Sequence, residues 1–325
     1  MNEADISNPA VKKRLGRLDV LRGIALVAMA TYHTGWDFEF FGYLEPGTTG
    51  HGAWKLYARL IASTFLVLVG FSLVLAHGQG IRWRRFGIRL AQIVAAALAI
   101  TLVTFYATPE SFVFFGILHQ IAAASILGLL FLRLPALLIA IAAVAVIAAP
   151  AYLASPTFDS PAYWMLGLSE IVIRSNDYVP IFPWFGAVLA GMALAKTLRY
   201  FNRLHLLSGA IAPARLDRVL RFIGRNSLVF YLVHQPVIIA CVFVIAQAFP
   251  PAVAPPREVF AQACTQSCQN DNDARFCQRF CGCIVDETER AKIFDDVFAG
   301  KRAQSDPQMQ DIVQSCTQSS FQPGD

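Results

Sequence analysis

Apolar stretches of about 20 residues recur along most of this chain and restrict its fold more than any other feature. A helix of about 20 residues spans the ~30 Å hydrocarbon core of a bilayer. Charged residues make up only 15% of the 325 residues, whereas soluble domains carry about a quarter. We therefore predict an all-α integral membrane protein with about seven transmembrane helices. The predicted spans are residues 18–42, 57–77, 90–107, 112–132, 135–154, 180–198 and 226–249.

Basic residues gather in alternate segments between the predicted spans. By the positive-inside tendency the N-terminus is cytoplasmic and, after seven spans, the C-terminus lies outside, as in a bacterial inner-membrane protein. The first span shows no small-residue cleavage site, so we expect no signal peptide. The net charge of +5 reflects membrane topology, and we exclude nucleic acid as a partner. The basic groups are Lys12, Lys13, Arg14 and Arg17; Arg82, Arg84, Arg85 and Arg89; Arg133; and Lys196, Arg199, Arg203, Arg215, Arg218 and Arg221.

The last 75 residues differ sharply from the rest, which suggests four parts. These are a basic N-terminus (1–17), a transmembrane domain (18–249), a Pro-rich linker (250–260) and a Cys-rich extracytoplasmic tail (261–325). The tail holds six cysteines at spacings that suit a helical hairpin turning at residues 270–273. Zinc binding is the alternative, although these spacings do not match the usual pairs of ligands. We predict a small disulfide-stapled helical tail with the pairs Cys264–Cys281, Cys268–Cys277 and Cys283–Cys316, and expect Cys241 to be a buried apolar residue of the last span.

Four ionisable residues of the first span fall on one helix face. At 100° per residue, Asp19, Arg22, His33 and Asp37 lie within a sector of about 60°, and Arg22 and His33 are about 16 Å apart along the axis. Ionisable groups at membrane depth usually mark a substrate or catalytic path. For Asp19 and Arg22 an interfacial i,i+3 pair is an equally good explanation. Asp37, one turn after His33, is placed to orient that imidazole and raise its basicity.

Other polar residues also suit a membrane-embedded site. His51 lies between glycines in the first outer loop, and His119 lies within the fourth span, where a structural hydrogen bond is the alternative role. Pro180 and Pro183 predict a break or kink at the outer end of the sixth span. The last span is predicted to be ended or kinked by Pro236. The substrate-cavity candidates are His119, Trp184, His234 and Gln235, and Ser227, Tyr231, His234 and Gln235 are also candidates for interhelical hydrogen bonds.

Four sequence blocks resemble a bacterial membrane family akin to the catalytic domain of heparan-alpha-glucosaminide N-acetyltransferase. They are RLDVLRGIALVAMATYHTGWDF, FFGILHQIAAAS, VPIFPWFGAVLAGMAL and IGRNSLVFYLVHQP, within residues 14–249. The Arg-x10-His spacing of Arg22 and His33 is also similar to the motif of membrane acyltransferase-3 proteins. His51 precedes Trp54 by three residues, as the active histidine of the heparan enzyme precedes a Trp. The Cys-rich tail falls outside the resemblance.

The resemblance implies an enzyme that takes an acyl group, usually acetyl, from cytosolic acyl-CoA to a sugar amine or hydroxyl on the far side. Acetyl-CoA would be the co-substrate, and we expect no metal. Guanidinium groups bind phosphate bidentately, so Arg22, Arg84, Arg85 and Arg225 are candidates for the CoA phosphates. His33 or His51 would act as general base or transient acyl carrier, with Asp37 orienting His33.

Two other functions fit the same residues. Kinked spans with intramembrane histidines also suit a proton-coupled transporter, although no inverted repeat is evident between the two halves. A membrane scaffold that presents the Cys-rich tail is the second alternative. Soluble catalytic signatures such as Gly-x4-Gly-Lys-Ser/Thr and Gly-x-Ser-x-Gly do not occur in the sequence. Membrane lipid is an expected partner, and an oligomer is compatible with the sequence.

Overall fold

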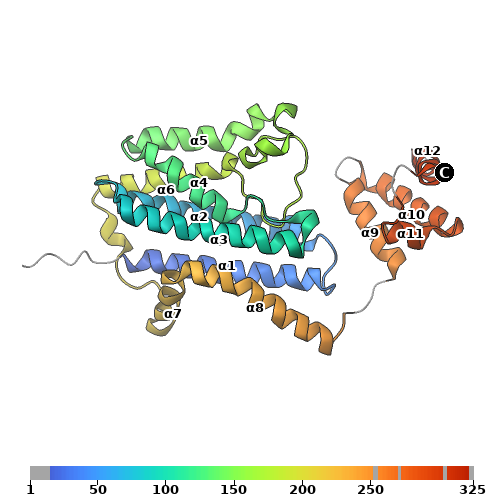
Figure 1. Ribbon diagram of the computed structural model, residues 1–325, viewed down its shortest axis with the longest axis horizontal. Helices are drawn as coiled ribbons and strands as arrows, with labels where there is room; N and C mark the ends of the chain where they lie inside the picture. The colour runs from blue at the N-terminus through green and yellow to red at the C-terminus, as the bar shows by residue number, and fades with distance from the viewer. Residues whose placement is uncertain (1–14, 252–254, 270–271, 303–305, 322–325) are drawn as a thin grey trace, which may run out of the picture. The chain divides into compact units, whose positions relative to one another are not determined.

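The computed structural model describes residues 15–251, 255–269, 272–302 and 306–321, and these residues form helices and loops without a strand (Figure 1). Lys12, Lys13 and Arg14 of the expected basic N-terminus lie outside the described residues. The same holds for residues 252–254 of the expected linker and for Asn270 and Asp271 of the expected turn.

The described chain has one helix in each predicted span. Five of these helices are long and apolar enough to cross a membrane, which confirms the prediction of an all-α membrane protein. The fourth is only 15 residues long, and the first carries the polar stripe from Asp19 to Asp37. These helices are α1 (Gly16–Phe40), α2 (Gly52–His77), α3 (Trp83–Ala107), α4 (Ile117–Phe131), α5 (Ala136–Leu153), α6 (Ile181–Tyr200) and α8 (Ser227–Ala248).

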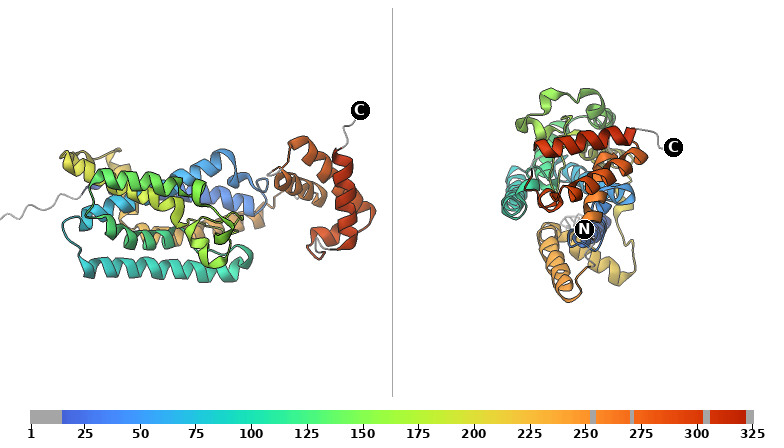
Figure 2. Two further views of the ribbon diagram at one scale, coloured as in Figure 1. Left: turned by 90° about the horizontal axis from the view of Figure 1, so that it is seen from above. Right: turned by 90° about the vertical axis from the view of Figure 1, so that its right-hand side faces the viewer.

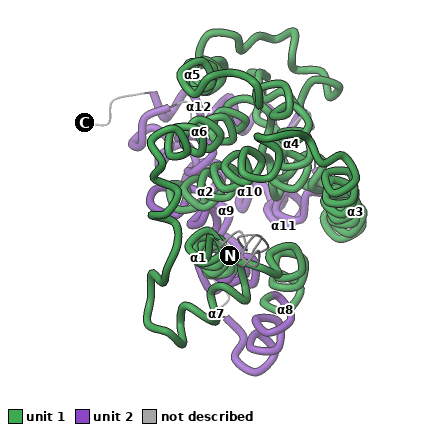
Figure 3. The backbone as a smooth tube through the Cα atoms, turned by 90° about the vertical axis from the view of Figure 1, so that its left-hand side faces the viewer, with its two compact units in different colours: residues 1–33, 55–238 green, residues 34–54, 239–325 purple. Residues whose placement is uncertain are grey.

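Internal contacts divide the chain into two compact units (Figure 3). The first unit contains residues 1–33 and 55–238, and the second contains residues 34–54 and 239–325. This division assigns residues 34–54 and 239–249 to the unit of the cysteine-rich segment, whereas the transmembrane domain expected from the sequence, residues 18–249, includes them.

The core of the first unit lies among α2, α4, α5 and α6, whose axes run alongside one another (Figures 1 and 2). Small residues bring α2 and α6 together. A Cβ atom on Gly70 would lie 1.9 Å from the Val188 carbonyl oxygen, and one on Gly191 would lie 2.0 Å from that of Val67. In a membrane, where lipid is as apolar as leucine, close backbone approach of this kind holds helices together by van der Waals contact.

Several helix boundaries differ from the predicted spans, and the predicted break before α6 is present. Span four was expected from residue 112, but α4 begins at Ile117, after an extended Gly116. The helix α3 begins at Trp83, so that Arg84, Arg85 and Arg89, which were expected in an inner loop, lie on its first turns. The predicted break at the start of α6 is present, since Phe182 has non-helical backbone angles of φ −95° and ψ 131° between Pro180 and Pro183.

Of the two alternatives for Pro236, the structure excludes an end of the helix, and the expectation for Cys241 was wrong. The helix α8 does not end at Pro236 but continues to Ala248, because one missing backbone donor is tolerated within a long helix. Cys241 is exposed rather than buried. Hydropathy alone does not distinguish a lipid-facing position from a buried one, and a thiol is apolar enough for both.

A short amphipathic helix, α7 (Ala214–Arg225), was not predicted and lies in the segment expected to be a basic linker. Its Leu220 and Gly224 are buried. A Cβ atom on Gly224 would lie 1.9 Å from the carbonyl oxygen of Asp19, so the backbones of α7 and α1 nearly touch. This contact places α7 beside the first turns of α1.

The cysteine-rich segment of the second unit folds into α9 (Pro256–Cys268), α10 (Ala274–Arg290), α11 (Phe294–Phe298) and α12 (Pro307–Phe321). Asp273 caps α10 by accepting hydrogen bonds from the backbone N–H groups of Arg275 and Phe276. Six cysteines of the described residues form the expected disulfides, which join α9 to α10 twice and α10 to α12 once. The pairs are Cys264–Cys281, Cys268–Cys277 and Cys283–Cys316.

Candidate active site

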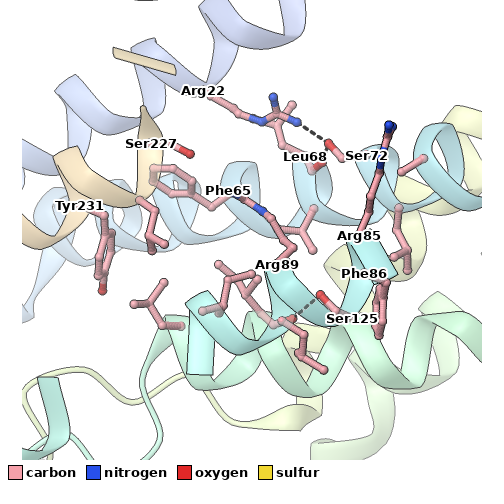
Figure 4. Close-up of a pocket in the computed structure, with 18 of the residues that line it drawn as sticks. Arg22, Phe65, Leu68, Ser72, Arg85, Phe86, Arg89, Ser125, Ser227 and Tyr231 are labelled. Atoms are coloured by element: carbon pink, nitrogen blue, oxygen red, sulfur yellow. Dashed lines mark hydrogen bonds between the residues drawn. The ribbon is translucent and has the colours of Figure 1, made fainter. Parts of the chain in front are cut away.

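A cavity of about 410 Å³ opens in the first unit among α1, α2, α3, α4 and α8 (Figure 4). Most of its wall is apolar, with Leu26, Phe65 and Leu118 among the lining residues. Its volume lies within the range of ~300–1,000 Å³ that small-molecule sites occupy. The basic side chains of the wall are Arg22, His77, Arg82, Arg85 and Arg89.

Asp19 and Ser72 hold Arg22 in the wall. Its guanidinium donates to the Asp19 carboxylate at 3.1 Å and to the Ser72 hydroxyl at 2.5 Å. The second oxygen of the buried Asp19 carboxylate accepts from Arg225 of α7 at 3.4 Å. The expected Asp19–Arg22 pair is therefore present, and Asp19 connects two arginines. A carboxylate that offsets part of this positive charge keeps the arginines close to one another.

Two arginines on the first turns of α3 line the cavity, in a segment that was predicted to precede this helix. Arg85 and Arg89 are four residues apart and therefore share a helix face. Arg82 precedes α3 and donates to the carbonyl of Ala76 at the end of α2. Of the four arginines predicted to bind CoA phosphates, Arg22 and Arg85 line the cavity, whereas Arg84 and Arg225 lie outside its lining. Arg82 and Arg89 were missed, although the i,i+4 spacing of Arg85 and Arg89 was visible in the sequence.

Two helix faces lead from the cavity to a pair of histidines. On α8, Ser227 and Tyr231 line the cavity, and His234 follows on the same face within one more turn. On α1, Arg22 and Leu26 line the cavity, and His33 lies on the same face about 10 Å beyond Leu26. The rings of His33 and His234 meet with a centroid distance of 5.1 Å. Both residues are recognisable in the sequence as site candidates, but their pairing is not, because it depends on how α1 packs against α8.

The hydrogen bonding of His234 determines which ring nitrogen carries its proton. Nδ1 lies 2.7 Å from the carbonyl oxygen of Tyr231, and a carbonyl can only accept, so Nδ1 is the donor. In the neutral ring Nε2 therefore keeps its lone pair. That atom is buried and makes no hydrogen bond within the described residues. An imidazole in this tautomer is suited to accept a proton.

His51 lies in the second unit, in a loop organised by Glu39. The Glu39 carboxylate accepts hydrogen bonds from the backbone N–H groups of Gly47 and Thr49 and from the Thr49 hydroxyl, at 2.6–2.7 Å. His51 is exposed, and its Nδ1 donates to the Gly47 carbonyl at 2.8 Å. Its Nε2 is then the acceptor nitrogen of the neutral ring.

The remaining predicted site residues have different surroundings. His119 uses both ring nitrogens structurally, since Nδ1 accepts from the Gly116 N–H at 3.2 Å and Nε2 lies 3.2 Å from the Thr101 hydroxyl. These bonds favour the structural role over a cavity role. Trp184 is half-buried against the main core, Gln235 is half-buried in α8, and Asp37 is fully buried in α1.

A half-buried carboxyl group from the loop before α6 caps the first turn of α4. Asp177 accepts a hydrogen bond from the backbone N–H of Ile117 at 2.8 Å. Gly116 leaves the space for it, because a Cβ atom there would lie 2.3 Å from the carboxylate. Burial raises the pKa of Asp177 to about 6.

The comparisons with known proteins give one match. A family model described as heparan-alpha-glucosaminide N-acetyltransferase, catalytic, matches residues 14–236. These residues include the cavity, the His33–His234 pair and His51. No curated protein and no solved structure matches the chain.

Proposed function

This chain belongs to the heparan-alpha-glucosaminide N-acetyltransferase catalytic family and is thus a membrane acyltransferase, and we propose that its donor is cytosolic acyl-CoA. Acetyl is the expected acyl group, since acetyl-CoA is the donor of enzymes of this kind. The acceptor in this proposal is a sugar amine or hydroxyl on the far side of the membrane.

The cavity is the observation that supports this proposal most directly. It combines four arginines, which suit the phosphates of CoA, with an apolar wall that suits an extended pantetheine arm. The shared helix faces of α1 and α8 continue from this cavity to His33 and His234. A thioester carried on the arm would therefore approach the histidine pair while the phosphates stay among the arginines.

In the proposed reaction the acceptor nitrogen or oxygen attacks the thioester carbonyl carbon. A new C–N or C–O bond forms, the C–S bond breaks, and CoA leaves as a thiolate. The acceptor proton passes to a histidine and then to the departing sulfur, so the ring returns to its neutral form. An acyl-histidine on the same ring is the two-step version of this transfer.

We assign the proton transfer to the His33–His234 pair, with Nε2 of His234 as the acceptor atom. His51 is the alternative base, because its exposed ring also keeps Nε2 as an acceptor. Asp37, one turn along α1 from His33, is proposed to position that ring. The arginine-rich side of the protein would face the cytoplasm, and the disulfide-bonded segment would lie in an oxidising compartment such as the bacterial periplasm.

Acetyl transfer in washed membranes, measured by the release of CoA, tests this function and shows which histidine acts as the base. We expect His33→Ala and His234→Ala each to lower kcat at least 100-fold, the usual size of a general-base contribution. If His51→Ala alone abolishes transfer, the base is His51 instead. If proteoliposomes take up the acceptor without acyl-CoA and no CoA is released in the transfer assay, the protein is a transporter and not an acyltransferase.

A further inference from the structure

The amphipathic helix α7 exposes a set of large apolar side chains. Leu216, Val219 and Phe222 have exposed fractions of 52%, 54% and 68%. They recur every three residues and therefore form one continuous strip along the helix. Their exposure would cost solvation free energy in water, so the strip indicates a binding surface.

A different side of α7 fixes the helix to the rest of the first unit. Asp217, Leu220 and Gly224 are buried, and the pKa of Asp217 is held below its usual value by the hydrogen bond from Arg221. Arg221 also donates to the Gly209 carbonyl at 2.7 Å. The apolar strip is therefore presented by a helix whose other side is already packed.

Exposed arginines share the outward side of the same helix with this strip. At 100° per residue, Leu216 and Val219 lie to one side of the outward direction and Arg218 and Arg225 to the other, while Phe222 and Arg215 lie close to that direction itself. Leu216 and Arg225 are about 180° apart. A packed side together with an exposed side of apolar and basic side chains is typical of a helix that lies flat at a membrane surface.

The chain order also places α7 at a bilayer surface. The helix follows α6 and precedes α8, both of which are long and apolar enough to span a membrane. Its position at the end of the bundle where α1 begins is visible in Figures 1 and 2. The segment between two successive spans must remain at one membrane face.

We propose that α7 binds the surface of an anionic phospholipid bilayer. Leu216, Val219 and Phe222 enter the boundary between headgroups and acyl chains, while Arg215 and Arg218 bind the lipid phosphates. Lipid fits this surface better than a protein partner because the flanking spans already hold the helix at the membrane. This inference does not depend on the acyltransferase proposal.

The test measures the thermal unfolding midpoint of the full chain in neutral detergent as phosphatidylglycerol or phosphatidylcholine is added. We expect phosphatidylglycerol to raise the midpoint at lower lipid concentration than phosphatidylcholine. The double variant Arg215→Gln/Arg218→Gln should need on the order of 30-fold more phosphatidylglycerol, because each arginine near an anionic surface contributes about fivefold to binding. Arg215→Lys/Arg218→Lys should retain most of the effect.

Arg174→Gln is the matched control, since Arg174 is an exposed arginine in the loop before α6. This variant should respond to phosphatidylglycerol as the unaltered protein does. An equal response of the Arg215→Gln/Arg218→Gln variant would overturn the proposal. So would an equal midpoint shift with soluble glycerol phosphate, which would assign the arginines to a free phosphate ligand.

Discussion

Ser72 is a neutral hydrogen-bond partner of Arg22, and the variant Ser72→Ala measures how much this bond contributes to donor binding. Replacing it with alanine removes one hydrogen bond from a guanidinium that lines the cavity. Hydrogen bonds to charged groups contribute about 1.5–3 kcal/mol. We expect Ser72→Ala to raise KM for acetyl-CoA at least about tenfold with a smaller change in kcat.

Ser125 provides the control for this measurement within the same cavity. Its hydroxyl donates to the Ile121 carbonyl of its own helix, so Ser125→Ala leaves Arg22 unaltered. Steady-state kinetics of the two variants should therefore differ. Equal KM values would show that Arg22 does not depend on Ser72 for donor binding.

Asp177 should make stability depend on pH. Its folded pKa of about 6 lies above the value of 3.8 for an unperturbed carboxyl group, so the folded state binds this proton more tightly than the unfolded state. The free energy of unfolding therefore falls as pH rises from about 4 to about 6, by up to about 3 kcal/mol from this group. In Asp177→Asn this contribution should disappear.

Thermal unfolding in detergent at pH 4 and pH 7 measures this difference. The asparagine oxygen still accepts from the Ile117 N–H, so the cap of α4 is kept while the titration is removed. Only the difference between the two proteins is interpreted, because other groups titrate in both. A pH dependence identical in the variant would contradict the raised pKa.

At the scale of helices, the contact between α1 and α7 connects the amphipathic helix with Arg22. Gly224→Ala would place a Cβ atom 1.9 Å from the Asp19 carbonyl, and backbone atoms cannot move aside as a flexible side chain can. Overpacking of this kind costs about 1–3 kcal/mol. We expect a lower unfolding midpoint and weaker acetyl-CoA binding, because Asp19 also holds Arg22.

The control for Gly224 is Gly87→Ala in α3, where the added Cβ atom would meet open space. Alanine has the higher helix propensity, so this change should leave stability equal or slightly higher. Binding of labelled acetyl-CoA and the unfolding midpoint compare the two variants. If Gly224→Ala is as harmless as Gly87→Ala, the close contact of α1 and α7 is not needed.

The helices could be predicted from the sequence more fully than the site. Spans of about 20 apolar residues are recognised because each must satisfy its own backbone within lipid. The helix α7 does not meet this criterion because it is short, and its arginines make the segment look like a basic linker. The cysteine spacings indicated two of the disulfides, since i,i+4 residues of facing helices meet, and the third pair was predicted from the two cysteines that remained.

The site was only partly predictable because it depends on contacts between distant helices. Arg22 and His33 share a face of one helix, which the sequence shows directly. The meeting of His33 with His234, and of Arg22 with Ser72, depends on the packing of α1 against α8 and α2. Arg89 was overlooked because the start of α3 was placed seven residues too late.

At the scale of the whole molecule, the disulfide-bonded segment should be dispensable for transfer. One contact argues otherwise, because the Gln266 side chain of α9 donates to the Pro46 carbonyl, in the loop that carries His51. That loop, however, is held by three hydrogen bonds to Glu39, which belongs to α1. Losing the single bond from Gln266 should therefore leave the loop in place.

Deleting residues 255–325 should thus keep acetyl transfer within about twofold to threefold, whereas Glu39→Gln in the full chain should lower it if His51 takes part. The deletion removes the Gln266 contact, and the Glu39 variant replaces the charged acceptor of the loop with a neutral one, which weakens its hydrogen bonds. CoA release by membranes containing equal amounts of each protein compares the two variants.

Loss of transfer in the deletion together with an unaffected Glu39→Gln variant would show that the segment, and not Glu39, maintains the His51 loop. Transfer kept in both variants would separate the loop from catalysis and leave the His33–His234 pair as the base.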